Sequence, residues 1–231
     1  MTPPIISHSA PVLLIGGGPV SKADMALART LTSKVVAVDG GALWAHQNDM
    51  AIDALVGDMD SVTPDILAGI PSHLCHPVEE QTTTDFDKAL RHVSAPLIIA
   101  IGFSGGRMDH QLAVLHSLLV HPDRACLVLG EEDLAFLAPK ALTLPLDPGT
   151  RVSLFPMGPV AGTSTGLRWP IDGLTFDPVQ RIGTSNAALG EITLRMEAPQ
   201  MLCLLPRAFI QPVAQALAQM PPALRWSARA E

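Results

Sequence analysis

Cysteine is scarce in this 231-residue chain, which has three: Cys75, Cys126 and Cys203. An odd and widely spaced set argues against the disulfide framework that holds many small secreted domains together. The stretch from Met1 to Pro11 also lacks the basic segment and long apolar run of a signal peptide. Both absences predict a protein of the reducing cytoplasm.

Basic residues and long hydrophobic runs are scarce as well. Lys and Arg total 15 against 22 acidic residues, which gives a formal net charge of -7, and no basic cluster occurs. Because a nucleic-acid binder needs a concentrated basic face, we expect no nucleic-acid partner. The best apolar stretch, Pro96–Phe103, is far too short to cross a bilayer, so no membrane partner is expected either. A small anionic ligand held by a metal and an arginine remains compatible with this charge.

Several familiar motifs are also missing. The chain has no Gly-x-x-x-x-Gly-Lys-Ser/Thr phosphate loop and no Gly-x-Ser-x-Gly nucleophile turn. His73, Cys75 and His76 lie close in sequence, but no second ligand pair with zinc spacing accompanies them. Classical nucleotide-loop, serine-hydrolase and zinc chemistry are therefore not indicated.

What is present is enough apolar material for a buried core, since 48% of the residues are hydrophobic. In the first half, short apolar runs alternate with helix-like segments. Buried strands are predicted at Val12–Ile15, Val35–Val38, Ala54–Val56, Leu97–Ile101 and Ala125–Leu129. Such runs predict a mostly parallel, Rossmann-like sheet with flanking helices, and most of them end in Gly or Asp, where such sheets bind ligands.

The pattern changes near Pro139. Beyond it, Gly, Pro, Ser and Thr separate short segments such as Arg151–Phe155 and Ile192–Met196, in which polar and apolar residues alternate. This alternation predicts antiparallel strands in an all-β, sandwich-like domain. The predicted domains are therefore an α/β domain over residues 11–138 and a β-domain over residues 139–231, with a terminal helix near Phe209–Met220.

Two acidic side chains follow the third predicted strand, in the run Gly57-Asp58-Met59-Asp60-Ser61. Residues two apart in extended chain face the same side, so Asp58 and Asp60 can converge. Asp85, at the start of a predicted helix, could be a third carboxylate at the same sheet edge. Converging carboxylates suit magnesium, although each segment alone is also compatible with an ordinary turn or helix cap.

A glycine-rich turn, Gly102 to His110, connects a predicted strand to a predicted helix. Glycines let the backbone approach a ligand, and a helix start offers N–H groups to phosphate oxygens. Arg107 could add a forked donor, or it could simply pair with Asp109. The run Val38–Ala42 ends another strand, where the backbone could approach a nucleotide or form a simple turn.

Taken in order, these segments resemble the thiamin pyrophosphokinase family. The match continues through Gly166-Leu167-Arg168-Trp169-Pro170 and Gly183-Thr184-Ser185-Asn186, and spans roughly Val12 to Pro206. The resemblance implies a magnesium-dependent transfer of the β,γ-pyrophosphoryl group of ATP to the hydroxyl of thiamine, which gives thiamine diphosphate and AMP. It also implies a homodimer with the thiamine site near its interface.

The resemblance further implies roles for individual residues. The catalytic set would be Asp58, Asp60, Asp85, Arg107 and Asp109, of which the first three would hold Mg²⁺. ATP would contact Asp39, Gly40, Gly41, Gly102, Gly105, Gly106 and Arg107. Thiamine would contact Thr184, Ser185 and Asn186. Trp169 would lie either in the core of the β-domain or near the ligand.

Two other functions stay open. The same catalytic half could act on another small alcohol, such as a hydroxymethyl pterin, or the chain could be a binding protein that senses nucleotide or thiamine without turnover. The Ser185-Asn186 segment and the β-domain favour thiamine. The joint presence of Asp58, Asp60, Asp85 and Arg107 favours an enzyme, because a sensor needs no complete metal set.

Overall fold

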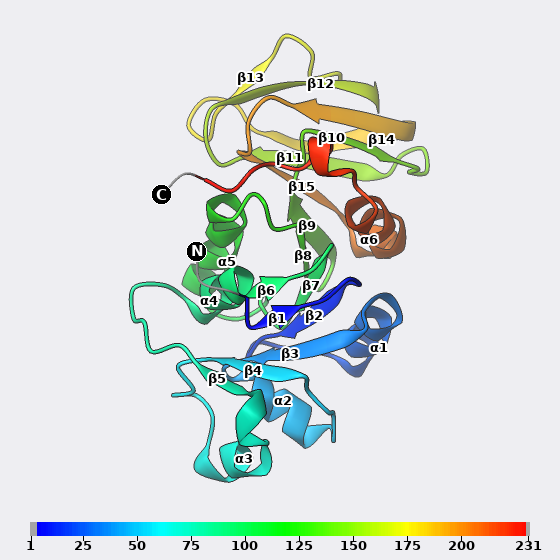
Figure 1. Cartoon of the computed structure of the whole chain (residues 1–231). Helices are drawn as coiled ribbons and strands as arrows, with labels where there is room; N and C mark the ends of the chain where they lie inside the picture. The colour runs from blue at the N-terminus through cyan, green and yellow to red at the C-terminus, as the bar shows by residue number, and fades with distance from the viewer. Residues whose placement is uncertain (1–3, 230–231) are drawn as a thin grey trace. The chain divides into compact units, whose positions relative to one another are not determined.

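The structure, a computed structural model, describes residues 4–229 and divides the chain into two compact units (Figure 1). The first unit runs to Ser117 and takes in Val128–Gly130, and the second comprises Leu118–Leu127 and the chain from Glu131 onward. This division does not coincide with the boundary expected after residue 138, because β9 (Asp133–Leu137) pairs antiparallel with β15 (Met201–Pro206). In the part of the chain that is described, no helix is long and apolar enough to span a bilayer.

Parallel strands form the main sheet of the first unit. Their order is β7-β2-β3-β4-β5, and every neighbouring pair is parallel. The bounds are Val12–Ile15 for β2, Lys34–Val38 for β3, Ala54–Gly57 for β4, Cys75–Pro77 for β5 and Ile98–Ile101 for β7. Strands β2, β4 and β7 are buried along their whole length, which explains why their sequences are continuously apolar.

Helices connect these strands: α1 (Lys22–Leu31), α2 (Gly41–Gln47), α3 (Pro64–Gly69), α4 (Asp85–His92) and α5 (Met108–Val120), with a short 3-10 turn, η1 (Ser72–Leu74). The N-terminus of α1 is a capping box, in which the Ser21 hydroxyl accepts from the Asp24 N–H and the Asp24 carboxylate accepts from the Ser21 N–H. A separate parallel pair joins β1 (Ile6–Ser7) to β6 (Val93–Ser94).

Gly41, at the first position of α2, lies against the carboxyl end of β2. A Cβ added there would be 1.9 Å from the Ile15 carbonyl oxygen and 2.7 Å from its carbon. We therefore expect Gly41→Ala to lower the free energy of unfolding by about 2–3 kcal/mol, because helix and strand must separate. The matched control is Gly69→Ala in α3, where an added Cβ meets nothing within 4 Å. Equal urea midpoints for the two variants would contradict this packing role.

Antiparallel strands dominate the second unit. Their order is β13-β12-β14-β11-β15-β9, and β10 also pairs with β14. The bounds are Ala141–Leu144 for β10, Arg151–Pro156 for β11, Val160–Leu167 for β12, Thr175–Phe176 for β13 and Gly183–Met196 for β14. Burial alternates along β11, as its sequence predicted. Strand β8 (Cys126–Leu129) carries the chain between units.

The second unit is not purely β, because it also contains α6 (Ile210–Ala218), the terminal helix that the sequence predicted. Helix α6 packs on β10 and is flanked by the 3-10 turns η2 (Arg207–Phe209) and η3 (Pro222–Leu224). Its position within the unit shows that the expectation of an all-β domain was too narrow.

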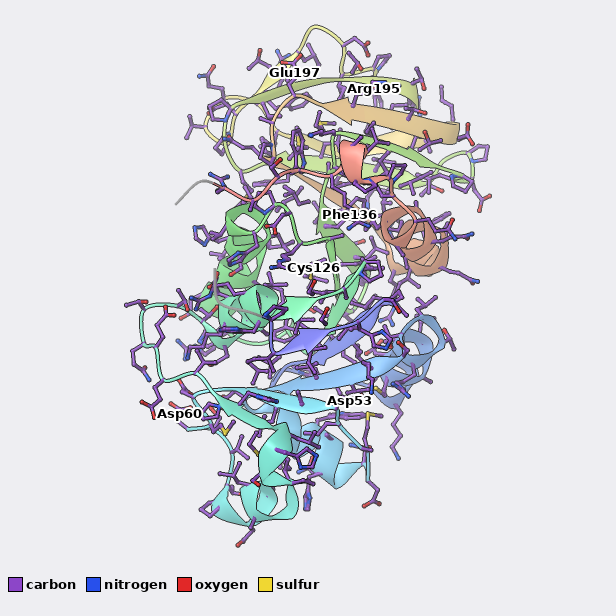
Figure 2. All side chains as sticks on the ribbon, in the orientation of Figure 1. Asp53, Asp60, Cys126, Phe136, Arg195 and Glu197 are labelled. Carbon is purple, nitrogen blue, oxygen red and sulfur yellow. The ribbon has the colours of Figure 1, made fainter. Side chains whose placement is uncertain are left out.

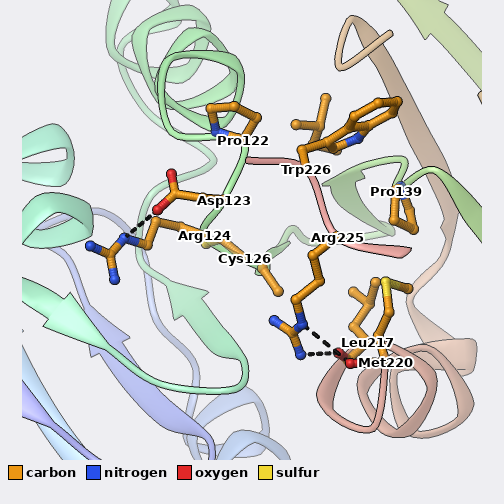
Figure 3. A pocket seen from close by; sticks show the side chains of 11 residues that line it. Pro122, Asp123, Arg124, Cys126, Pro139, Leu217, Met220, Arg225 and Trp226 are labelled. Carbon is orange, nitrogen blue, oxygen red and sulfur yellow. Dashed lines mark hydrogen bonds and ion pairs between the residues drawn. The ribbon is translucent and has the colours of Figure 1, made fainter. Parts of the chain in front are cut away.

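The segment after α6 packs against the second unit through hydrogen bonds to its backbone. Trp226 donates its Nε1 hydrogen to the Ala138 carbonyl at 2.9 Å. Arg225 donates to carbonyls at the end of α6, those of Leu217, Ala218 and Met220. Figure 3 shows Arg225 directed at that helix end, beside a cavity of about 20 Å³ that Cys126 also lines. This cavity has room for about one water molecule and for no larger ligand, so we assign the segment a structural role.

Candidate active site

Three aspartates come together after β3 and β4. Asp39 follows β3, Asp58 and Asp60 follow β4, and their carboxylate oxygens lie within 4.8 Å of one another. Figure 2 shows Asp60 in the loop after β4, at the opposite end of that strand from Asp53. The predicted convergence of Asp58 and Asp60 is therefore found, and Asp39, expected at the nucleotide, joins them. Such a set of carboxylates fits a hard cation.

The backbone around this acidic cluster is unusual. Asp39 and Met59 have φ values of 44° and 65°, in the left-handed region that non-glycine residues seldom adopt. The loop is held by its own polar groups: the Asp58 carboxylate accepts from the Asp60 N–H, and the Ser61 hydroxyl donates to Asp60 at 3.0 Å. The alternative that this segment forms a turn is thus also correct, and the turn brings the carboxylates of Asp58 and Asp60 together.

A buried lysine links this cluster to Asp85. Lys88 Nζ lies 3.1 Å from Asp58 Oδ2 and 2.9 Å from Asp85 Oδ1, and its side chain is 1% exposed. Burial opposes both charges, yet hydrogen bonds and mutual attraction outweigh it. They raise the pKa of Lys88 and lower the pKa of Asp58. Sequence reasoning missed this role, although the Asp-x-x-Lys spacing puts Asp85 and Lys88 on one helix face.

The predicted metal role of Asp85 stays a prediction. Asp85 is the first residue of α4, and Thr84 caps this helix by accepting from the Asp87 N–H. The structure pairs Asp85 with Lys88 and does not place it among the three carboxylates that lie within 4.8 Å of one another.

The glycines of the β7–α5 turn have different tasks. Gly102, with φ of 74°, is packed so closely that an added Cβ would lie 2.7 Å from the Gly16 carbonyl oxygen. A Cβ added at Gly106 would meet nothing within 4 Å, and one added at Gly105 would meet Pro19 at 3.8 Å. With its side-chain oxygen turned toward the loop, Gln111 accepts from their N–H groups at 2.6 and 3.3 Å. Two backbone donors thus converge on one oxygen, as they would on a phosphate oxygen.

Arg107 forms the ion pair that the sequence left as an alternative. Its Nε and Nη2 contact the two carboxylate oxygens of Asp109 at 3.1 and 2.6 Å, and both side chains are well exposed. Their hydrogen bonds raise the pKa of Arg107 and lower that of Asp109. Since an exposed pair contributes little stability, the guanidinium can exchange its partner at small cost. Within residues 4–229, Arg107 forms no ion pair with the acidic cluster, and its phosphate role stays a prediction.

The residues expected at thiamine lie on β14 of the second unit. Thr184 and Ser185 are exposed, and Ser185 has φ of 62°. Asn186 is buried, and its amide is used internally: Oδ1 accepts from the Trp169 N–H at 3.1 Å and Nδ2 donates to the Trp169 carbonyl at 2.7 Å. Asn186 therefore holds the Trp169 backbone in place. Its contact with thiamine stays a prediction.

Trp169 itself is not a core residue, because 54% of it is exposed. The guanidinium of Arg168 lies 5.0 Å from the centre of its ring. The sequence left open whether Trp169 is part of the core, and the structure excludes that option.

Two known domain families match this chain. Residues 28–128 match the thiamin pyrophosphokinase catalytic domain, and residues 141–201 match the thiamin pyrophosphokinase vitamin B1 binding domain. Thiamine pyrophosphokinase 3 of Oryza sativa subsp. japonica is 29% identical over an alignment of 161 positions that covers 62% of this chain and 60% of the relative. Thiamine pyrophosphokinase 2 of Arabidopsis thaliana is 31% identical over an alignment of 188 positions that covers 67% of this chain and 70% of the relative.

Solved structures show the same fold. Thiamin pyrophosphokinase from Candida albicans superposes with a TM-score of 0.71 at 18% identity, covering 89% of this chain and 95% of that one. The protein from Geobacillus thermodenitrificans gives 0.71 at 23% identity, covering 85% and 96%. The two domain matches and the Arabidopsis relative show that this chain belongs to the thiamin pyrophosphokinase family.

Proposed function

We propose that this chain transfers the pyrophosphoryl group of ATP to the hydroxyl of thiamine. The observation that carries the proposal is the cluster of Asp39, Asp58 and Asp60, whose carboxylate oxygens lie within 4.8 Å of one another. The cluster follows two adjacent parallel strands, and a Rossmann-like sheet binds ligands at that edge. The matched vitamin B1 binding domain supports thiamine as the acceptor.

The donor set fits magnesium, which prefers oxygen ligands and is usually held by carboxylates together with substrate phosphates. Asp58 and Asp60 are supported by sequence and geometry, Asp39 is added by the geometry, and Asp85 retains its proposed role from the family resemblance. A bound Mg²⁺ would supply charge neutralisation at the phosphates.

The reaction forms a bond from the thiamine oxygen to the β-phosphorus and breaks the bridge between the α- and β-phosphates. AMP leaves, and the hydroxyl proton is released. Because phosphoryl transfer depends mostly on positioning and charge, the protein needs no covalent intermediate. Lys88 orients Asp58, the N–H groups of Gly105 and Gly106 bind phosphate oxygens, and Arg107 exchanges Asp109 for phosphate.

The remaining parts of the proposal concern thiamine and the assembly. Thr184 and Ser185 are exposed and available to thiamine, and Asn186 supports the adjoining Trp169 segment. Membership of the family supports a homodimer with the thiamine site near its interface. The three free cysteines support a cytoplasmic location.

The decisive test is AMP formation from ATP and magnesium, with and without thiamine. We expect thiamine-dependent AMP in equal amount to thiamine diphosphate, and loss of both when EDTA removes the metal. AMP formation with a hydroxymethyl pterin but not with thiamine would support the proposed catalytic function and contradict thiamine as the acceptor. No AMP with either alcohol, with nucleotide still bound, would favour a sensor.

A further inference from the structure

The loop between β5 and α4, residues 78–84, folds around the carboxylate of Glu80. Glu80 Oε1 accepts from the hydroxyls of Thr82 and Thr83. Its other oxygen, Oε2, accepts from Arg91 Nη2 at 2.7 Å. Hydrogen bonds from Thr82 and Arg91 lower the pKa of Glu80 to about 2, so this carboxylate is charged throughout the neutral range.

Arg91 ties this loop to the body of α4. Besides Glu80, its Nη2 donates to the Thr83 hydroxyl at 3.0 Å, and its Nε lies 3.2 Å from Asp87 Oδ2. One guanidinium thus contacts two loop side chains and a residue of its own helix. Both hydrogen bonds come from Nη2, and Nε contributes only its proximity to Asp87. An isolated surface ion pair holds little in place, whereas one charged group shared by the loop and the helix connects the two.

The loop that is held in this way leads directly to the acidic site. Gln81, next to Glu80, donates its Nε2 hydrogen to Asp58 Oδ2 at 3.4 Å. At the other end of the loop, Thr84 caps α4 and is followed by Asp85, the partner of Lys88. A displaced loop would therefore break the contact of Gln81 with Asp58 and disturb the Thr84 cap that precedes Asp85.

We propose that Glu80 and Arg91 form a clasp that holds the β5–α4 loop against the acidic site and so positions Gln81 and Asp85. The two residues of the clasp are positioning residues, since their contacts are with the loop and α4 rather than with the three clustered carboxylates. The catalytic consequence rests on the proposed function, whereas the holding of the loop does not.

The test compares Glu80→Gln, Arg91→Met and the double variant with wild type. Removal of a residue that orients a metal ligand typically costs 10- to 100-fold in metal affinity or activity. We expect each single variant to raise the KM for MgATP by about 10-fold with a smaller change in kcat. The double variant should lose no more than the worse single one, because the two residues act as a unit. Arg91→Lys should recover part of the loss in KM, since lysine restores the positive charge without the planar guanidinium group.

Hydrogen exchange of residues 78–84 gives a readout that does not depend on activity. We expect faster exchange there in both single variants and unchanged exchange in α5. The matched control is Lys34→Met, which removes the cation of another ion pair of the first unit. The cation and the carboxylate are 42% and 30% exposed in that pair and 35% and 32% exposed in the clasp. The control should change neither the loop nor the KM for MgATP.

Two results would overturn the clasp. One is unchanged loop exchange in Glu80→Gln and Arg91→Met. The other is a lowered melting temperature with wild-type kcat and KM per folded molecule. That result would mean that Glu80 and Arg91 stabilise the fold without positioning the site. If wild type forms no AMP, the proposed function fails, and the exchange measurement still tests whether the clasp holds the loop.

Discussion

Asp60→Asn is expected to reduce the turnover number by at least about 100-fold while the protein stays folded, because the substitution removes one of three clustered carboxylates. The Asp60 side chain is exposed and lies in the loop after β4, so its loss disturbs no core packing. Steady-state AMP formation measures the loss, and Mn²⁺ titration followed by its paramagnetic resonance measures the weakened metal binding.

The control for this variant is Asp65→Asn, the same substitution at an exposed position in the first turn of α3. It should leave both turnover and metal binding at wild-type values. Normal turnover in Asp60→Asn would remove this residue from the metal site. A shared loss in both variants would mean that net charge, rather than the cluster, controls the rate.

Lys88→Met is expected to lower both stability and activity. Methionine fills a similar volume but leaves the carboxylates of Asp58 and Asp85 without the ammonium group that lies within 3.1 Å of each. Breaking a buried ion pair on one side costs about 3 kcal/mol, and we expect a loss in unfolding free energy near that value. We also expect at least about a 10-fold loss in kcat/KM, because Asp58 loses its orienting partner.

Magnesium distinguishes this explanation from a simple packing defect. A divalent cation replaces the positive charge that Lys88→Met removes, so the stability loss should shrink when unfolding is repeated with millimolar Mg²⁺. Lys22→Met, at an exposed position in α1, is the control and should change little under either condition. A stability loss of Lys88→Met that is independent of magnesium would contradict the electrostatic role.

Much of the fold was predictable because strands such as β2, β4 and β7 are buried on both faces and therefore read as continuous apolar runs. The helix α6 was also visible in the sequence, and it lies in the second unit, within the predicted range of residues 139–231. The assignment of β9 to the second unit was not predicted, since its partner β15 is far away in the chain.

In the candidate site, too, features within one segment were predictable from the sequence, whereas contacts between distant segments were not. The sequence by itself determined that Asp58 and Asp60 lie in one short segment after β4, where the turn at Met59 brings their carboxylates together. Only the tertiary structure decided that Asp39 joins them, since this depends on β3 pairing with β4. It also decided that Lys88 contacts Asp58 and that the Asn186 amide is turned to Trp169. Local pattern fixes which chemical groups a segment carries, whereas pairing and packing between distant segments determine which groups meet.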